Sequence, residues 1–220
     1  MANLTSNRER EERAAARSCG TCSLCCTVLR VDELQKPAGE NCRHQLGVGS
    51  HANGREAAAQ GSEDREGGGD PGPPGGGGCA IYQDRPHICR AYQCLWRQGG
   101  LEDDERPDAT GGIVDLESVG IGLRLGIRMP SIDAFDASAK LRAIAERYRS
   151  EMPIRISDTR DVTNPDRPFR VLLPDGIEHY VSGDRIEIYR DGVQVAEKVL
   201  PWAERLGRRI LVAWRRRNLP

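Results

Sequence analysis

The chain has 220 residues, of which 38% are hydrophobic and 30% charged, with 32 basic side chains against 33 acidic ones. A formal net charge of −1 excludes attraction of the whole surface to nucleic acid or anionic lipid, although a local basic patch could still act. No apolar run approaches the roughly 18 residues of a membrane helix, and the Arg- and Glu-rich first twenty residues are not an export signal. We therefore expect a cytoplasmic protein of one or two domains, with neither a membrane nor nucleic acid as partner.

Residues 1–18 form a charged leader. Residues 8–16 have high helix propensity, but they offer no apolar stripe that would dock a helix on a core. We predict a flexible, solvated helix here.

Eight cysteines follow, all within the first 94 residues, in one set of five and one set of three. Buried structural cysteines scatter through a core, and disulfides need an oxidising compartment, for which no export signal is visible. Short Cys-x-x-Cys steps instead bring several thiolates to one point, as metal ligation requires. The candidate metal ligands are Cys19, Cys22, Cys25, Cys26, Cys42, Cys79, Cys89 and Cys94.

A low-complexity insert at residues 45–78 separates the two sets within a metal-binding module that spans residues 19–97. Its Gly- and Pro-rich composition cannot build a core, so we predict a disordered loop that tethers two halves of one site. Closing such a loop costs roughly 3 kcal/mol of entropy, whereas structural zinc sites supply about 10–16 kcal/mol. The insert can therefore interrupt the site without abolishing it.

The second set lies in a predicted helix. Asp84 as N-cap and Pro86 in the first turn predict that this helix starts near residue 86, runs through Trp96 and ends at Gly99-Gly100. Residues 98–112 then form an acidic linker.

Residues 113–220 are predicted to be an α+β region with hairpins and two helices. The first helix covers residues 135–148, with Ser131 or Asp133 as its cap, and the second starts after Pro201, with arginines on a solvated face. Residues 120–126 are predicted to form a Gly-rich turn. The predicted strands are residues 113–119 and 154–156, and the predicted hairpins are 169–173 with 177–181 and 185–189 with 193–195.

Thiolates favour soft or borderline metals, and the first three cysteines have the spacing of bacterial ferredoxin ligands. Two four-cysteine zinc sites, one four-iron cluster with spare thiols, and a larger assembly all remain open. Four thiolates around Zn²⁺ leave a charge of −2, so flanking arginines could donate hydrogen bonds to sulfur. These arginines are Arg43, Arg85, Arg90 and Arg97, and the lesser ligand candidates are His44 and His87.

Three segments carry a family likeness. They are the run from Cys19 to Cys26, the run from Lys36 to Cys42, and the Tyr-x-x-Arg-Pro-x-x-Cys-Arg block that begins at Tyr82. Together they resemble the YkgJ-type cysteine-cluster family, which is described as a zinc- or iron-chelating domain. The likeness covers about residues 19–97 and implies that the eight matched cysteines bind a metal.

The leading hypothesis is a metal-binding protein that holds a zinc ion or an iron–sulfur cluster in a structural or electron-relay site. The alternative is a modifying enzyme of the protein-methylase or redox type, because flagellin lysine methylases carry a similar cluster. Against that alternative, the glycines at 120, 122 and 126 have one residue too many for the G-x-G-x-x-G spacing. A zinc-stabilised adapter without chemistry is a third possibility.

Overall fold

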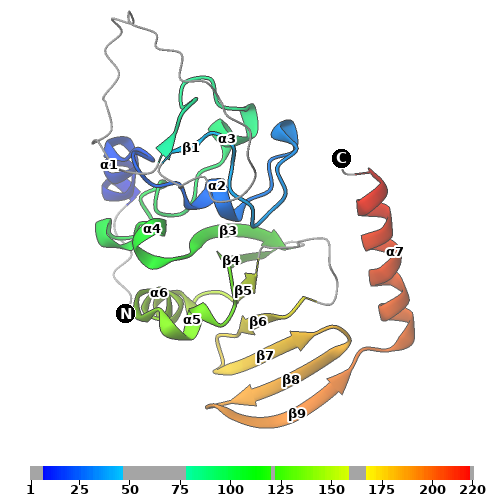
Figure 1. Ribbon diagram of the computed structural model, residues 1–220. Helices are drawn as coiled ribbons and strands as arrows, with labels where there is room; N and C mark the ends of the chain where they lie inside the picture. Colours follow the sequence, from blue (N-terminus) through cyan, green and yellow to red (C-terminus); the bar gives the residue numbers. More distant parts are fainter. Residues whose placement is uncertain (1–6, 47–77, 120–121, 159–166, 219–220) are drawn as a thin grey trace, which may run out of the picture.

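The computed structural model describes residues 7–46, 78–119, 122–158 and 167–218 (Figure 1). The fold is α+β, with a seven-stranded mixed sheet, a separate two-stranded ladder, and helices of 4 to 17 residues. No helix in these ranges is both long and apolar enough to cross a membrane.

The large sheet follows chain order from β3 to β9. All neighbours are antiparallel except β4 and β5, whose parallel pairing requires a crossover. Helices α5 (Ala134–Ala137) and α6 (Ala139–Arg149) make that crossover. The strands are β3 (Ile113–Val119), β4 (Gly122–Met129), β5 (Ile154–Asp158), β6 (Phe169–Leu172), β7 (Ile177–Ser182), β8 (Arg185–Arg190) and β9 (Val193–Val199).

One face of β3 and β4 is apolar and forms the core. Val114 lies opposite Ile127 in the strand register, and residues that pair directly share a face. They join Leu141 and Ile144 of α6 in one buried cluster, to which Leu95, Trp96 and Leu101 also belong. The sheet and the segment that carries the second cysteine set therefore share a hydrophobic core.

The other face of β3 and β4 is charged. Alternation places Asp115 and Glu117 on this face, opposite Gly126 and Arg124 of β4. The cysteine-bearing segments lie on this side, since Ile113 of β3 and the described cysteines line the same cavity. The sheet thus separates an apolar core from a polar wall of the candidate site.

The predicted strands and both hairpins are confirmed, but the predicted helix over residues 135–148 is wrong in its extent. Ser138 is extended, with φ −90° and ψ 100°, and divides the segment into α5 and α6. Its Oγ accepts a hydrogen bond from the Leu141 N–H at 3.4 Å, so Ser138 caps α6. Of the two predicted cap residues, Asp133 occupies the N-cap position of α5, without a capping hydrogen bond from its side chain. With α7 (Trp202–Asn218), the described part of the C-terminal region therefore has three helices, not two.

The Gly-rich segment is also corrected in part. Residues from Gly122 onward belong to strand β4 and pair with β3, so they do not form a turn. Positions 120–121 lie outside the described residues.

Helix α1 (Asn7–Ala16) has no buried residue, in agreement with the absence of an apolar stripe. Polar contacts hold it against the turn at residues 97–100. The Arg10 Nε donates to the Gln98 carbonyl at 3.2 Å, and Arg97 donates to the Ala14 carbonyl. Gly99 has φ +77°, and a Cβ there would lie 2.1 Å from the Arg10 carbonyl oxygen. The leader helix thus approaches this turn backbone to backbone.

Candidate metal centre

The first four cysteines lie on two consecutive tight turns. The Cys22 N–H donates to the Cys19 carbonyl at 2.8 Å, and Cys25 and Cys26 lie on the single-turn helix α2 (Leu24–Val28). The Cys26 N–H donates to the Ser23 carbonyl at 2.9 Å. Because each turn reverses the chain within three residues, the Cys-x-x-Cys steps keep these thiols close together.

Cys42 is brought back to α2 by a backbone hydrogen bond, in which its N–H donates to the Cys26 carbonyl at 3.1 Å. Lys36 stabilises the loop in between. Its Nζ donates to the Thr27 and Leu29 carbonyls at the end of α2, which have no partner within the helix, and to the Pro37 carbonyl. Lys36 is only 6% exposed, and this burial lowers its pKa, while the nearby thiols of Cys42 and Cys26 act in the opposite direction. Sequence reasoning missed this lysine.

A short ladder connects the two cysteine sets. Strand β1 (Gln45–Leu46) pairs antiparallel with β2 (Gly78–Cys79), so that Gln45 faces Cys79. The Ala80 N–H donates to the His44 carbonyl at 2.8 Å and extends the pairing. The ends of the predicted insert therefore meet, while its residues 47–77 lie outside the described part of the chain.

Cys89 lies on the short helix α3 (His87–Ala91), and the prediction that Asp84 caps this helix is wrong. Pro86 occupies the cap position, and the carboxylate of Glu33 accepts hydrogen bonds from the His87 and Ile88 N–H groups at 3.1 and 3.0 Å. Glu33 belongs to the 3₁₀ helix η1 (Asp32–Leu34), so this cap also ties the first cysteine set to the second.

The predicted helix is also shorter than expected, because α3 ends at Ala91 and leaves Cys94 in the turns that follow. The Leu95 N–H donates to the Val114 carbonyl of β3 at 2.7 Å. This bond fixes Cys94 at the edge of the large sheet. The expected linker that follows contains η2 (Asp103–Glu105) and α4 (Pro107–Thr110).

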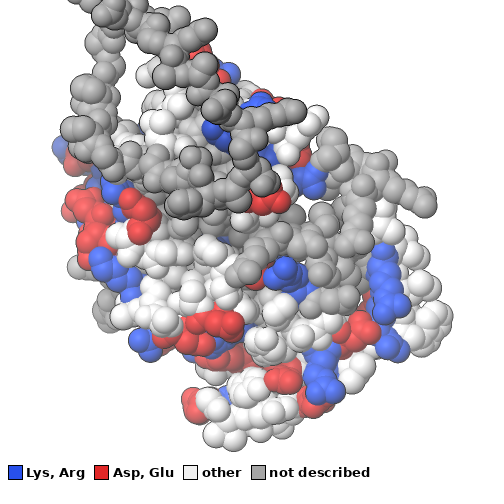
Figure 2. Space-filling view, viewed as in Figure 1, with Lys and Arg blue, Asp and Glu red and all other residues white. Residues whose placement is uncertain are grey.

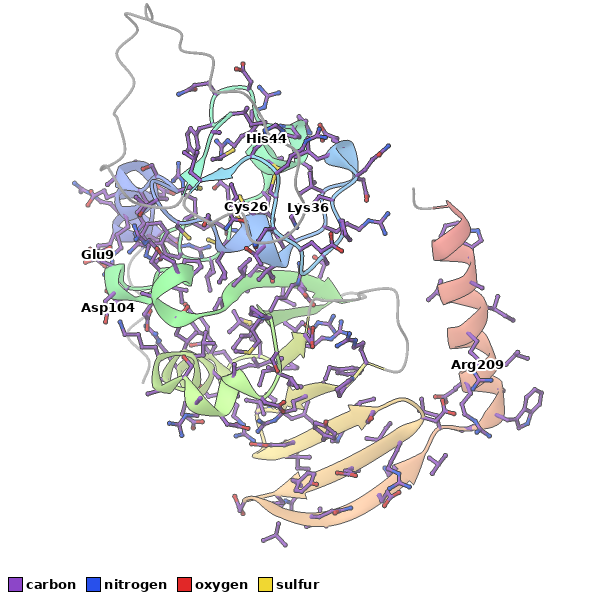
Figure 3. The ribbon with its side chains drawn as sticks, in the orientation of Figure 1. Glu9, Cys26, Lys36, His44, Asp104 and Arg209 are labelled. Carbon is purple, nitrogen blue, oxygen red and sulfur yellow. The ribbon has the colours of Figure 1, made fainter. Side chains whose placement is uncertain are left out.

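One cavity of about 370 Å³ unites the site, because all eight candidate cysteines line it. His44 lines it too, whereas His87 is not among the described lining residues. Figure 3 shows Cys26 and Lys36 near α2 with His44 above them. Within the described ranges, no group of three or more His, Cys, Asp or Glu side chains is already arranged to hold a metal ion. The thiols surround a common space rather than one point.

The thiols are free and half-buried, and burial disfavours their charged forms. Burial raises the pKa of Cys22 to about 11. A hydrogen bond with Cys26, together with burial, raises the pKa of Cys25 further. Burial also raises the pKa of three other thiols, with neighbouring thiols adding to the effect, namely Cys79, Cys89 and Cys94. An uncompensated set of thiolates is thus unfavourable in this cavity.

Two of the four predicted arginines, Arg85 and Arg97, line the cavity, and so do Arg30 and Arg128, which the prediction omitted. The Arg85 Nε donates to the Tyr82 carbonyl at 2.7 Å, and its guanidinium lies 3.7 Å from the centre of the Tyr82 ring. Arg43 donates to the His44 Nε2 at 3.2 Å. The Arg85 guanidinium is therefore held beside the thiols by a hydrogen bond to a carbonyl and a contact with an aromatic ring.

A polar network on the sheet forms part of the cavity wall. The Tyr92 hydroxyl donates to the Asp115 Oδ2 at 2.9 Å, and Arg128 lies 3.5 Å from the same oxygen. Arg128 and Arg124 each donate to Glu117 at 2.7 Å. Burial and the adjacent Asp115 raise the pKa of Tyr92, so the phenol stays protonated. The sequence signal that could have identified this network is the charged residues at alternate positions of β3 and β4.

Comparison with family models, with curated proteins and with solved structures finds no match to this chain.

Proposed function

We propose that the protein binds a metal through its eight cysteines, as a zinc ion or an iron–sulfur cluster in a structural or electron-relay site of the YkgJ type. The observation that carries the proposal is the convergence of the cysteines. They come from two sets separated by the insert, yet all eight line one cavity. Thiols gathered in this way by several separate turns are typical of metal ligation.

The residues present fit such a group. Eight sulfur donors exceed the four that one zinc ion or one four-iron cluster requires. Val28, Leu34 and Ile88 contribute apolar wall, and Arg30 and Arg97 place positive charge beside it. Bound metal would offset part of the thiolate charge that burial makes unfavourable, and an iron–sulfur cluster would in addition supply one-electron chemistry.

The alternative function, a modifying enzyme, is favoured by one separate observation. A purely structural zinc site is closed by its ligands, whereas this cavity wall also carries Tyr92 and Arg128. The Tyr92 phenol and the buried Asp115 form a hydrogen-bonded pair able to hold a proton beside the thiols. Binding of adenosylmethionine, measured by calorimetry, tests the methylase version, and no detectable heat counts against it.

Anaerobic purification followed by an absorption spectrum, metal analysis and a labile-sulfide assay tests the main proposal. A brown protein with labile sulfide would identify an iron–sulfur cluster, and a colourless protein with stoichiometric zinc would identify zinc. Protein that retains neither metal refutes the proposal. Cys42→Ser should lower the metal content, whereas the matched control His87→Ala should not, because His87 is not among the described lining residues.

A further inference from the structure

Exposed apolar side chains concentrate at the C-terminal end of the described chain. Of the eleven large hydrophobic residues exposed among the described residues, eight lie between Val193 and Trp214, on β9 and α7. Scattered exposed residues are normal in proteins, but a concentration of this kind marks an interaction surface. Figure 1 shows α7 as a separate rod beside the end of the sheet.

Four of these side chains form a stripe along α7. Trp202, Leu206, Ile210 and Trp214 follow one another at intervals of four residues, which places them on one side of the helix. They are 71%, 49%, 60% and 60% exposed. At 1.5 Å per residue, the helix is about 25 Å long, with a tryptophan near each end of the stripe.

The charge of α7 is predominantly positive. Its sequence contains six arginines against one acidic residue, Glu204, which gives a net charge of +5 in a chain whose total is −1. Figure 2 shows blue and white side chains next to each other along this helix, and Figure 3 shows Arg209 on it. Helices that pair with other helices usually carry both signs of charge beside their apolar seam. A helix with a strong net positive charge instead complements an anionic surface.

Contrary to the expectation of no membrane partner, we propose that α7 lies flat on an anionic membrane surface, with its apolar stripe among the lipid headgroups and acyl chains and its arginines other than Arg205 at the lipid phosphates. Tryptophan suits this boundary because its ring is apolar and its indole N–H is polar. The first turn of the helix is held to the sheet, since Arg205 pairs with Asp184 at 3.4 Å and the Leu200 N–H donates to the Asp184 carbonyl at 2.8 Å.

Vesicle binding by the full chain tests this proposal. We expect the protein to sediment with phosphatidylcholine vesicles that contain phosphatidylglycerol, and to bind pure phosphatidylcholine vesicles at least tenfold more weakly. Trp202 and Trp214 are exposed whereas Trp96 is only 8% exposed, so insertion should shift the tryptophan emission to shorter wavelength. High salt should weaken binding, because the arginine contribution is screened.

Matched variants identify the surface. The double substitution Leu206→Glu and Ile210→Glu should weaken vesicle binding at least tenfold. Leu123→Glu should leave it unchanged, because Leu123 is equally exposed, at 56%, but lies on β4. The triple substitution Arg215→Gln, Arg216→Gln and Arg217→Gln should abolish the preference for phosphatidylglycerol and keeps the stripe intact if the first variant misfolds.

Several results would overturn the proposal. They are absence of vesicle binding, equal binding by the Leu206→Glu, Ile210→Glu variant, and RNA binding without vesicle binding. A dimer, detected by light scattering, that the same variant converts to a monomer without any vesicle binding would assign the stripe to a second copy of the chain.

Discussion

Arg17 links the leader to the second cysteine segment, and its replacement by alanine should destabilise the protein strongly. The guanidinium is buried and donates to the Trp96 carbonyl at 2.6 Å and the Leu101 carbonyl at 2.8 Å. It also lies 4.7 Å from the centre of the Trp96 ring. The Leu101 carbonyl would lose its donor at a cost of about 1–3 kcal/mol, whereas the Trp96 carbonyl still accepts from the Gly99 N–H at 3.0 Å. The cation–π contact contributes about 0.5–1 kcal/mol. The ion pair with Asp103 adds little, because that carboxylate is 92% exposed. We expect Arg17→Ala to lower the free energy of unfolding by about 2–4 kcal/mol.

Denaturant unfolding of anaerobically purified protein, followed by circular dichroism, measures this loss. Arg13→Ala is the matched control, since Arg13 makes an exposed pair with Glu102 at 2.9 Å and its loss should cost less than about 1 kcal/mol. Arg17→Lys should fall between the two, because one ammonium cannot reproduce the fork of the guanidinium. If Arg17→Ala unfolds with the same midpoint as Arg13→Ala, the proposed anchoring role of Arg17 is wrong.

Three further predictions concern the β1–β2 ladder at the base of the insert and the polar network on the sheet. Replacing residues 47–77 with Asn-Gly should leave the metal content unchanged, because Leu46 and Gly78 already pair. The shorter loop should raise the free energy of unfolding by about 2 kcal/mol. A loss of metal in the purified variant would contradict the first expectation. Gly126→Ala should destabilise the protein by about 1–3 kcal/mol in thermal melts, since the added Cβ would lie 2.7 Å from oxygens of both Asp115 and Glu117. The control Gly207→Ala should not destabilise it, because the space around Gly207 is open. Burial raises the pKa of Asp115 above its ordinary 3.8, so this carboxyl stabilises the fold in acid and loses that contribution as the pH rises through its folded pKa. Asp115→Asn should therefore lower the free energy of unfolding more at pH 4 than at pH 7, and equal losses at both would refute the assignment.

The strands were predictable because their signal is local. Alternating residues in 113–119 and the turn residues Pro174-Asp175-Gly176 define β3 and the β6–β7 hairpin without any distant contact. The helix boundaries were harder to predict. Ser138 divides one apolar pattern into two helices by adopting an extended backbone, although the apolar spacing continues across it.

The sequence predicted the cysteines of the candidate site, but not the residues that hold the cysteine-bearing segments in place. Cysteine spacing identified the residues that line the cavity, because closely spaced thiols are rare in other contexts. The cap on α3 comes from Glu33, more than fifty residues earlier, and no local pattern relates the two positions. Tyr92 and Asp115 likewise meet only through the folding of the sheet.

The β1–β2 ladder makes the position of the insert a suitable point for protein engineering. Paired strands lie about 5 Å apart, so the chain leaves and re-enters the cysteine-bearing part of the fold at almost the same place. A folded reporter domain whose own ends lie close together can therefore take the place of residues 47–77 without moving Cys42 away from Cys79. Such a chimera would carry its optical signal directly beside the eight thiols and could report metal loading in living cells.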